Sequence, residues 1–175
     1  MPSVWERLFG VEADDIVLKG QLARTGQQYV QAAAGSCKVG ATAGWTVASA
    51  ANTALVTLAA SQTASTLVIP IRVPLKVGWT ITGFSVIAQI ESAGGTVTLD
   101  AALRKQTNAA GDPVDASVGA ITQVSVTADT AVSSAKNGLS EIVAADETFY
   151  ILVTGTTAAS TDIALQGITL TVDEV

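Results

Sequence analysis

Two aspartates and an asparagine in one polar segment have the chemistry of a calcium site. Asp112 and Asp115 lie in the sequence QTNAAGDPVDASVG, which also contains Asn108. Calcium prefers carboxylate and carbonyl oxygens, but this segment lacks the D-x-D-x-D-G spacing and the bidentate glutamate of an EF-hand. An Asp-Pro pair commonly begins a type I turn with solvated carboxylates. The turn is the favoured interpretation, and no metal or other cofactor is predicted.

Three acids further along the chain could supply the two carboxylates of a glycosidase. They are Glu141, Asp146 and Glu147, and the last two form a polar corner before the strand-like sequence TFYILVTG. Solvated carboxylates at such a corner also protect the edge of a sheet. The chain contains no histidine, so the commonest general acid and base is missing. We therefore expect that the protein is not an enzyme.

Two other parts of the sequence carry reactive or charged side chains that could form a site. Arg72 and Lys76 could bind an anion or a sugar together with Trp79, but an alternating strand places the ring opposite the two cations. The only cysteine, Cys37, would need Lys38 or a helix terminus to activate its thiol. We expect Cys37 to be a small buried residue, and a single cysteine excludes an intrachain disulfide.

The negative charge of the chain lies in residues 39–175. This part holds five basic and eleven acidic residues and so carries the whole net charge of −6. Such a body repels phosphate backbones, so nucleic acid is not an expected partner. The start MPSVWERLFG lacks a basic region followed by a long apolar one, and no stretch reaches about 18 uninterrupted apolar residues. No membrane partner is expected, and synthesis in a cytoplasm is the simplest interpretation.

The first ten residues predict one short helix. Ser3 and Glu6 have the spacing of a capping box, and Trp5, Leu8 and Phe9 share one helical face. A helix of this length cannot bury two aromatic rings against itself. The face is therefore expected to dock either on the protein's own body or on a neighbouring chain.

Residues 1–40 are expected to form an N-terminal arm, and residues 41–175 a β-sandwich domain. Alternating apolar residues over 65–82 predict one long strand, or two strands separated near Lys76 and Gly78. In the same run Pro70 and Pro74 lie on the opposite face, and proline is tolerated at the edge of a sheet.

Later strands are predicted with bends between them. The apolar phase shifts from odd to even positions at Gly83 and again at Gly167. A glycine at such a shift is typical of a β-bulge or of a bend at which a strand passes from one sheet to the other, and two of them suggest strands that turn corners between two packed sheets. Asn137-Gly138 is the strongest hairpin signal. Further strands are expected at 96–105, 120–128, 147–155 and 161–175. The predicted fold class is all-β: a jelly-roll-like antiparallel β-sandwich with a short N-terminal helical arm.

The run LVIPIRVPLKVGWTITGFSVIAQI and the later FYILVTG and DIALQGITLTV resemble small jelly-roll virion proteins of tailed bacteriophages. The resemblance covers about residues 45–175 and lies in strand texture and composition. It implies a capsid decoration (cement) protein or a fibre-type module, usually a homotrimer. On this basis we expect a structural protein of the virion, made in the host cytoplasm, that stabilises the head by oligomeric surface burial. Its partners would be copies of itself and a major capsid protein or another virion protein.

The predicted assembly contacts are Trp5, Leu8, Phe9 and Trp45. The last lies within 39–71, a stretch without charged residues that suits a tightly packed interface. The alternative is a receptor- or glycan-binding jelly-roll module of a tail or head fibre. That function needs exposed aromatic residues on loops, for which Trp45 is the only candidate. A carboxylate-based hydrolase ranks last.

Overall fold

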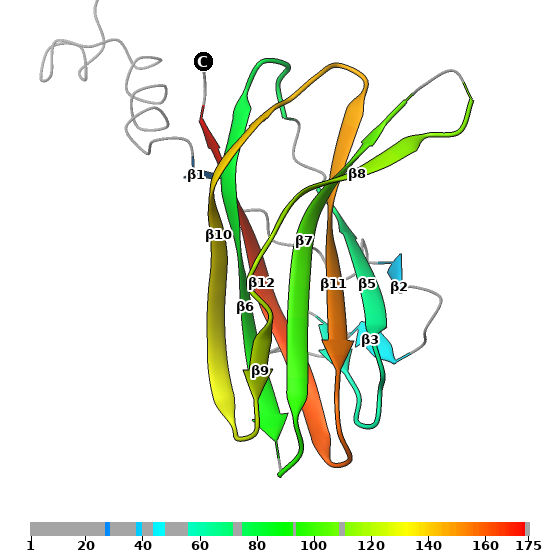
Figure 1. Cartoon of the computed structure of the whole chain (residues 1–175), viewed down its shortest axis with the longest axis vertical. Helices are drawn as coiled ribbons and strands as arrows, with labels where there is room; N and C mark the ends of the chain where they lie inside the picture. The colour runs from blue at the N-terminus through cyan, green and yellow to red at the C-terminus, as the bar shows by residue number, and fades with distance from the viewer. Residues whose placement is uncertain are drawn as a thin grey trace, which may run out of the picture.

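The computed structural model describes residues 27–28, 38–39, 44–47, 56–71, 75–92, 94–108 and 111–173. These residues form strands, turns and loops (Figure 1). The strands are β1 (Gln27–Gln28), β2 (Lys38–Val39), β3 (Trp45–Val47), β4 (Val56–Leu58), β5 (Ser65–Pro70), β6 (Thr80–Ser92), β7 (Val97–Thr107), β8 (Val114–Ala120), β9 (Val124–Val126), β10 (Thr130–Ile142), β11 (Glu147–Thr156) and β12 (Thr161–Asp173). None of the described residues belongs to a helix that is long and apolar enough to cross a bilayer.

The strands form two antiparallel sheets. Sheet A has the order β10-β6-β12-β4-β3, with β1 also paired to β12, and sheet B has the order β2-β5-β11-β7-β8, with β9 also paired to β7. From β4 to β7 and again from β9 to β12 the chain changes sheet at each strand, whereas β7, β8 and β9 follow one another in sheet B. The last two strands return beside two early ones: β12 pairs with β4, and β11 pairs with β5. This nesting of Greek keys is the jelly-roll topology. The predicted jelly-roll sandwich is confirmed, whereas the predicted helix at residues 1–10 lies outside the described residues.

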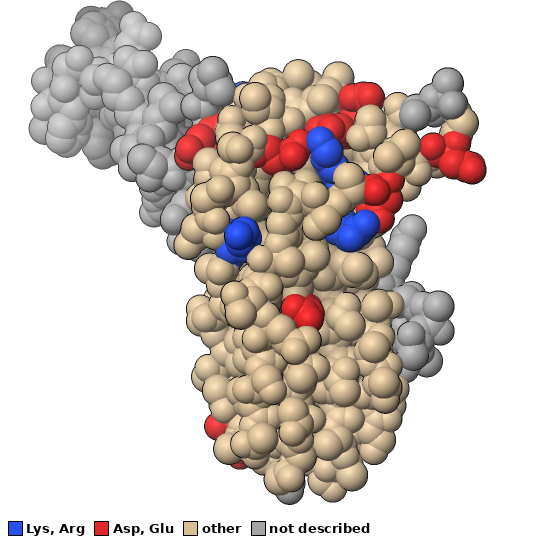
Figure 2. Space-filling view, in the orientation of Figure 1, with Lys and Arg blue, Asp and Glu red and all other residues tan. Residues whose placement is uncertain are grey.

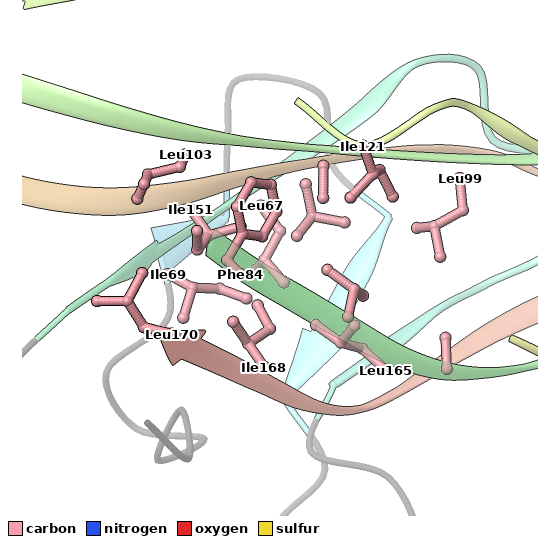
Figure 3. Packing of buried hydrophobic residues seen from close by; sticks show 14 of the residues in the cluster. Leu67, Ile69, Phe84, Leu99, Leu103, Ile121, Ile151, Leu165, Ile168 and Leu170 are labelled. Atoms are coloured by element: carbon pink, nitrogen blue, oxygen red, sulfur yellow. The ribbon is translucent and has the colours of Figure 1, made fainter. Parts of the chain in front are cut away.

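The core lies between the two sheets and is built by the alternation seen in the sequence. In β5, Leu67 and Ile69 point inward and are almost fully buried, and in β11 Ile151 does the same. Figure 3 shows these side chains meeting Phe84 of β6 and Leu170 of β12 in the middle of the sandwich. Each such burial contributes about 1.5–3 kcal/mol relative to an exposed side chain. Hydrophobic contact across the interface therefore holds the sheets face to face.

At Gly83 and Gly167 the predicted β-bulge is confirmed, whereas the predicted bend between sheets is wrong, because β6 and β12 each lie in sheet A only. The register between β6 and β12 skips Thr82, next to Gly83, and skips Gln166, next to Gly167. A Cβ atom on Gly83 would lie 2.7 Å from the carbonyl oxygen of Lys136, so the close approach of β10 requires glycine there. The bulges let β6 and β12 keep apolar side chains on the core face although the sequence period shifts.

Of the two alternatives for residues 65–82, the one with two strands separated near Lys76 and Gly78 is confirmed, and the one long strand is not. The two strands, β5 and β6, belong to different sheets, so the chain crosses the sandwich between them. The predicted hairpin is wrong. Asn137-Gly138 makes no hairpin: β10 runs straight through it, and the pair lies in an irregularity where the register with β6 shifts. Gly138 has a φ of 72°, so its freedom serves a bulge inside a strand instead of a turn.

The remaining strand predictions hold in part. The segment 120–128 is divided, because β8 ends at Ala120 and Ile121 turns into the core before β9 begins. Pro70 ends β5, beyond the two residues that pair with β2, which agrees with a position at the margin of the sheet. Pro74 lies outside the described residues.

Part of the predicted N-terminal arm pairs with the sandwich. Gln27–Gln28 adds a short strand to β12, and Lys38–Val39 adds one to β5. The rest of residues 1–40 lies outside the described residues, and the domain boundary near residue 40 stays a prediction.

Candidate functional site

The outer face of sheet B brings an aromatic ring together with polar and apolar side chains. β11 lies between β5 and β7, so Tyr150 is opposite Pro70 on one side and opposite Arg104 on the other. One step along the same face, Leu152 lies opposite Val68. These positions alternate with the buried ones, and they point away from the core.

Tyr150, Arg104 and Asp115 form a hydrogen-bonded cluster on this face. Arg104 Nη2 lies 2.6 Å from Asp115 Oδ2, and Arg104 Nε donates to the same oxygen at 3.0 Å. The Tyr150 hydroxyl donates to Asp115 Oδ1 at 2.7 Å. Asp115 stands on β8, opposite Gln106 of β7, so the cluster ties three neighbouring strands together.

The cluster fixes the protonation states of its members. The hydrogen-bonded Arg104 guanidinium lowers the pKa of Asp115, and Asp115 in turn raises the pKa of Arg104. Burial, and then the hydrogen bond to Asp115, raises the pKa of Tyr150. At neutral pH the carboxylate is ionised and the tyrosine hydroxyl keeps its proton. An exposed ion pair adds only about 0–1 kcal/mol to stability, so its main consequence is to orient the ring.

An open groove of about 510 Å³ lies beside this cluster. Its polar lining comes from Asp115, Gln106, Thr148 and Tyr150, and its apolar lining from Val68, Pro70, Ile71, Phe149 and Leu152. In Figure 1 the ends of β7 and β8 lean away from the body of the sandwich, on the side of β5. Gln106 and Asp115 belong to this projecting ribbon. The groove is therefore bounded by the ribbon and by the outer face of β11 and β5.

A second ionic cluster joins the two sheets. Lys105 Nζ of β7 lies 2.6 Å from Glu141 Oε1 of β10 and 2.7 Å from Glu147 Oε1 of β11. The Glu147 side chain is only 8% exposed. Lys105 lowers the pKa of Glu147, and the hydrogen bonds to Glu141 and Glu147 raise the pKa of Lys105. A glycosidase needs one carboxyl with a raised pKa as its general acid, and Glu147 has the opposite shift.

The charged side chains gather on one half of the visible face. Figure 2 shows them over β8 and the neighbouring ends of β7, β10 and β11, whereas the half that carries β9 shows little charge. Of the predicted acidic group, Glu141 and Glu147 are brought together by Lys105, and Asp146 is exposed without joining them.

The oxygen groups that could have formed a calcium site do not come together. Asp115 pairs with Arg104, while Asp112 and Asn108 are exposed. Among the described residues, no three His, Cys, Asp or Glu side chains are placed as they would be around a metal ion.

The prediction that Lys76 and Trp79 lie apart is wrong. Lys76 Nζ lies over the Trp79 ring, 5.3 Å from its centroid. The chain turns at residues 77–78, so strand alternation does not apply between them. Trp79 is 8% exposed, and this contact covers its ring instead of opening it to a ligand. Arg72 and Cys37 lie outside the described residues.

Trp45 is placed within the sandwich. It is 3% exposed, and its indole Nε1 donates to the backbone oxygen of Ser65 at 3.0 Å. Its ring is thus covered by the protein's own core, and contact with a partner stays a prediction. The other predicted assembly contacts, Trp5, Leu8 and Phe9, lie outside the described residues.

Tyr150 and Gln106 were not singled out from the sequence. Alternation in TFYILVTG already places Tyr150 on the outer face, and alternation in TVTLDAALRKQ does the same for Gln106. The missing information was the strand order, which sets β11 beside β7.

Comparison with known proteins gives no family. No protein-family model matches the chain, and no curated protein is similar enough in sequence to count as a relative. Similar solved structures include the carbohydrate-binding module CBM36 in complex with calcium and xylotriose. It is 18% identical, with coverage of 82% of this chain and 99% of that one, and a TM-score of 0.49.

Two further similar structures come from xylan-related proteins. The CBM22-1-GH10 modules of a Clostridium thermocellum endo-1,4-beta-D-xylanase, complexed with xylohexaose, are 12% identical, with coverage of 83% of this chain and 28% of that one, and a TM-score of 0.48. The CBM22-2 xylan-binding domain from Paenibacillus barcinonensis is 12% identical, with coverage of 78% and 92% and a TM-score of 0.48. At TM-scores below 0.5 these likenesses carry no argument about function. None of the three is a virion protein, so they add nothing to the phage resemblance.

Proposed function

We propose that this chain is a non-catalytic binding module that holds a carbohydrate on the outer face of sheet B. One observation supports the proposal: the groove combines a tyrosine ring, planar polar groups and an apolar floor. Tyr150 supplies the ring, Asp115 and Gln106 supply the planar polar groups, and Pro70 and Leu152 supply the floor. Ligand sites of this size are mostly apolar, with a few placed polar groups that fix orientation.

This combination suits the chemistry of a sugar. A pyranose ring has C–H faces that pack on an aromatic plane, and its hydroxyl groups both donate and accept hydrogen bonds. The carboxylate and amide groups offer matching acceptors and donors. Tyr150 is held by Asp115 and Arg104 before any ligand arrives. Preorganisation of this kind lowers the entropic cost of binding.

The test is affinity gel electrophoresis against soluble neutral polysaccharides (β-glucan, arabinoxylan, galactomannan and dextran), followed by calorimetry with oligosaccharides of the one that retards the protein. Replacing Tyr150 by alanine is expected to weaken binding about tenfold, because an aromatic contact contributes about 0.5–1.5 kcal/mol beyond its buried area. Thr154→Ala is the matched control. It lies on the same strand and outer face but outside the groove lining.

Two results would overturn the proposal. One is that none of the polysaccharides retards the wild-type protein. The other is that Tyr150→Ala and Thr154→Ala bind equally well while both remain folded by circular dichroism.

A second candidate is the assembly role expected from the sequence, as a homotrimeric decoration protein of a capsid. The outer face of sheet A supports it. The middle of this face carries small or uncharged side chains such as Ser85, Gln89, Ser133 and Thr169, together with Ile87, which is 42% exposed. An interface core is depleted in charge in the same way. This candidate predicts self-association through sheet A, and it is compatible with a carbohydrate on sheet B.

A further inference from the structure

The groove offers a ligand one charged side chain, and that side chain is an acid. Asp115 lines the groove, whereas the guanidinium of Arg104 that holds it is outside the lining. The other polar lining groups, Gln106, Thr148 and the protonated Tyr150, are neutral. A ligand on this face therefore meets a carboxylate before it meets the counter-ion.

Asp115 still has room for a ligand. Its side chain is 40% exposed. Oδ2 accepts from Arg104 Nη2 and Nε, and Oδ1 accepts from the Tyr150 hydroxyl and, at 3.2 Å, from the shared Arg104 Nε. The Nε–H is shared between both oxygens, so its long contact to Oδ1 is the one that a sugar hydroxyl can replace by donating to Oδ1. A second carboxylate cannot donate in this way. Like charges at short range repel, and the net charge of −6 on the chain adds to this repulsion.

We propose that the groove selects neutral saccharides and rejects acidic ones, and that Asp115 is the residue that sets this preference. This inference rests on the proposed carbohydrate-binding function. It adds a role for the ion pair beyond orienting Tyr150. Arg104 holds Asp115 in place and keeps it ionised, and the negative charge of Asp115 disfavours the binding of anionic saccharides.

The experiment compares two sets of polysaccharides at low salt. The wild-type protein is expected to be retarded by at least one neutral polysaccharide and not by polygalacturonate or alginate. Asp115→Asn leaves Arg104 as an unpaired cation beside the groove. Relative to neutral polymers, its affinity for the acidic ones is therefore expected to rise at least tenfold, and the gain should fall as salt screens the charge.

Two further variants separate the site from net charge and from folding. Asp112→Asn removes the same charge from the same ribbon outside the groove lining, so the preference is expected to stay as in the wild type. The paired change Arg104→Gln with Asp115→Asn removes both charges. The affinity of this double variant for acidic relative to neutral polymers is expected to lie between that of the wild type and that of Asp115→Asn. The double variant provides the test if Asp115→Asn does not fold.

The outcomes distinguish this inference from the proposed function. If the wild-type protein binds neutral and acidic polysaccharides alike, or if Asp112→Asn shifts the preference as much as Asp115→Asn, the selectivity inference is wrong and carbohydrate binding stands. If no polysaccharide of either kind binds, both are wrong.

Discussion

Gly155 offers a sharp test of how the core is packed around Trp45. It lies on the inner side of β11, where a Cβ atom would be 2.5 Å from Leu58 Cδ2, 3.1 Å from Ile163 Cδ1 and 3.2 Å from Trp45 Cζ2. Carbon atoms in contact prefer about 3.5–4.0 Å. Gly155→Ala therefore forces three buried side chains to move, and such overpacking costs about 1–3 kcal/mol.

The assay is thermal unfolding followed by far-ultraviolet circular dichroism, with urea unfolding followed by tryptophan fluorescence. For a domain of this size each kcal/mol lowers Tm by about 2–4 °C, so a fall of about 2–12 °C is expected. Gly167→Ala is the matched control. Nothing lies within 4 Å of a Cβ atom there, and its φ is not in the left-handed region, so its effect should stay within about 0.5 kcal/mol.

An unchanged Tm for Gly155→Ala would refute the reasoning. It would mean that the space beside Gly155 is open and that the Trp45 ring is not fixed there. The ring would then be available to a partner, as the sequence first suggested.

Two more predictions concern the sheets. Lys105→Met is expected to destabilise the fold by about 1–2 kcal/mol at neutral pH, because a nearly buried Glu147 loses its charge partner. The lowered pKa of Glu147 makes this contribution disappear as pH falls through it, and the raised pKa of Lys105 makes it disappear as pH rises through it. Urea unfolding from pH 3 to 9 should show a difference that is constant near neutral pH and shrinks toward pH 3, as Glu147 takes up a proton. A difference that does not change over this range would contradict the assignment. Ile87→Asp is expected to lower the molar mass measured by light scattering if sheet A mediates assembly, and a wild-type monomer would remove that candidate.

The sequence predicted the strands and bulges correctly where a local pattern of residues decides the backbone geometry. Alternation identified β5, β7, β11 and β12, since each strand has one face in the core. Gly83 and Gly167 were readable as bulges because the apolar phase changes at each. Asn137-Gly138 misled because glycine permits positive φ both in a turn and in a bulge, and the pairing of β10 with β6 on either side of it decides between them.

The site depends on information that strand patterns do not contain. Tyr150 and Arg104 are far apart in the chain, and they meet only because a jelly roll inserts β11 between β5 and β7. Asp115 then reaches both because β8 folds back on the projecting end of β7. Alternation could place each side chain on the outer face of its strand, but it could not predict which strands are neighbours in one sheet. The strand order is fixed by burial of the inner residues, so the packing of the hydrophobic core determines which polar residues line the groove.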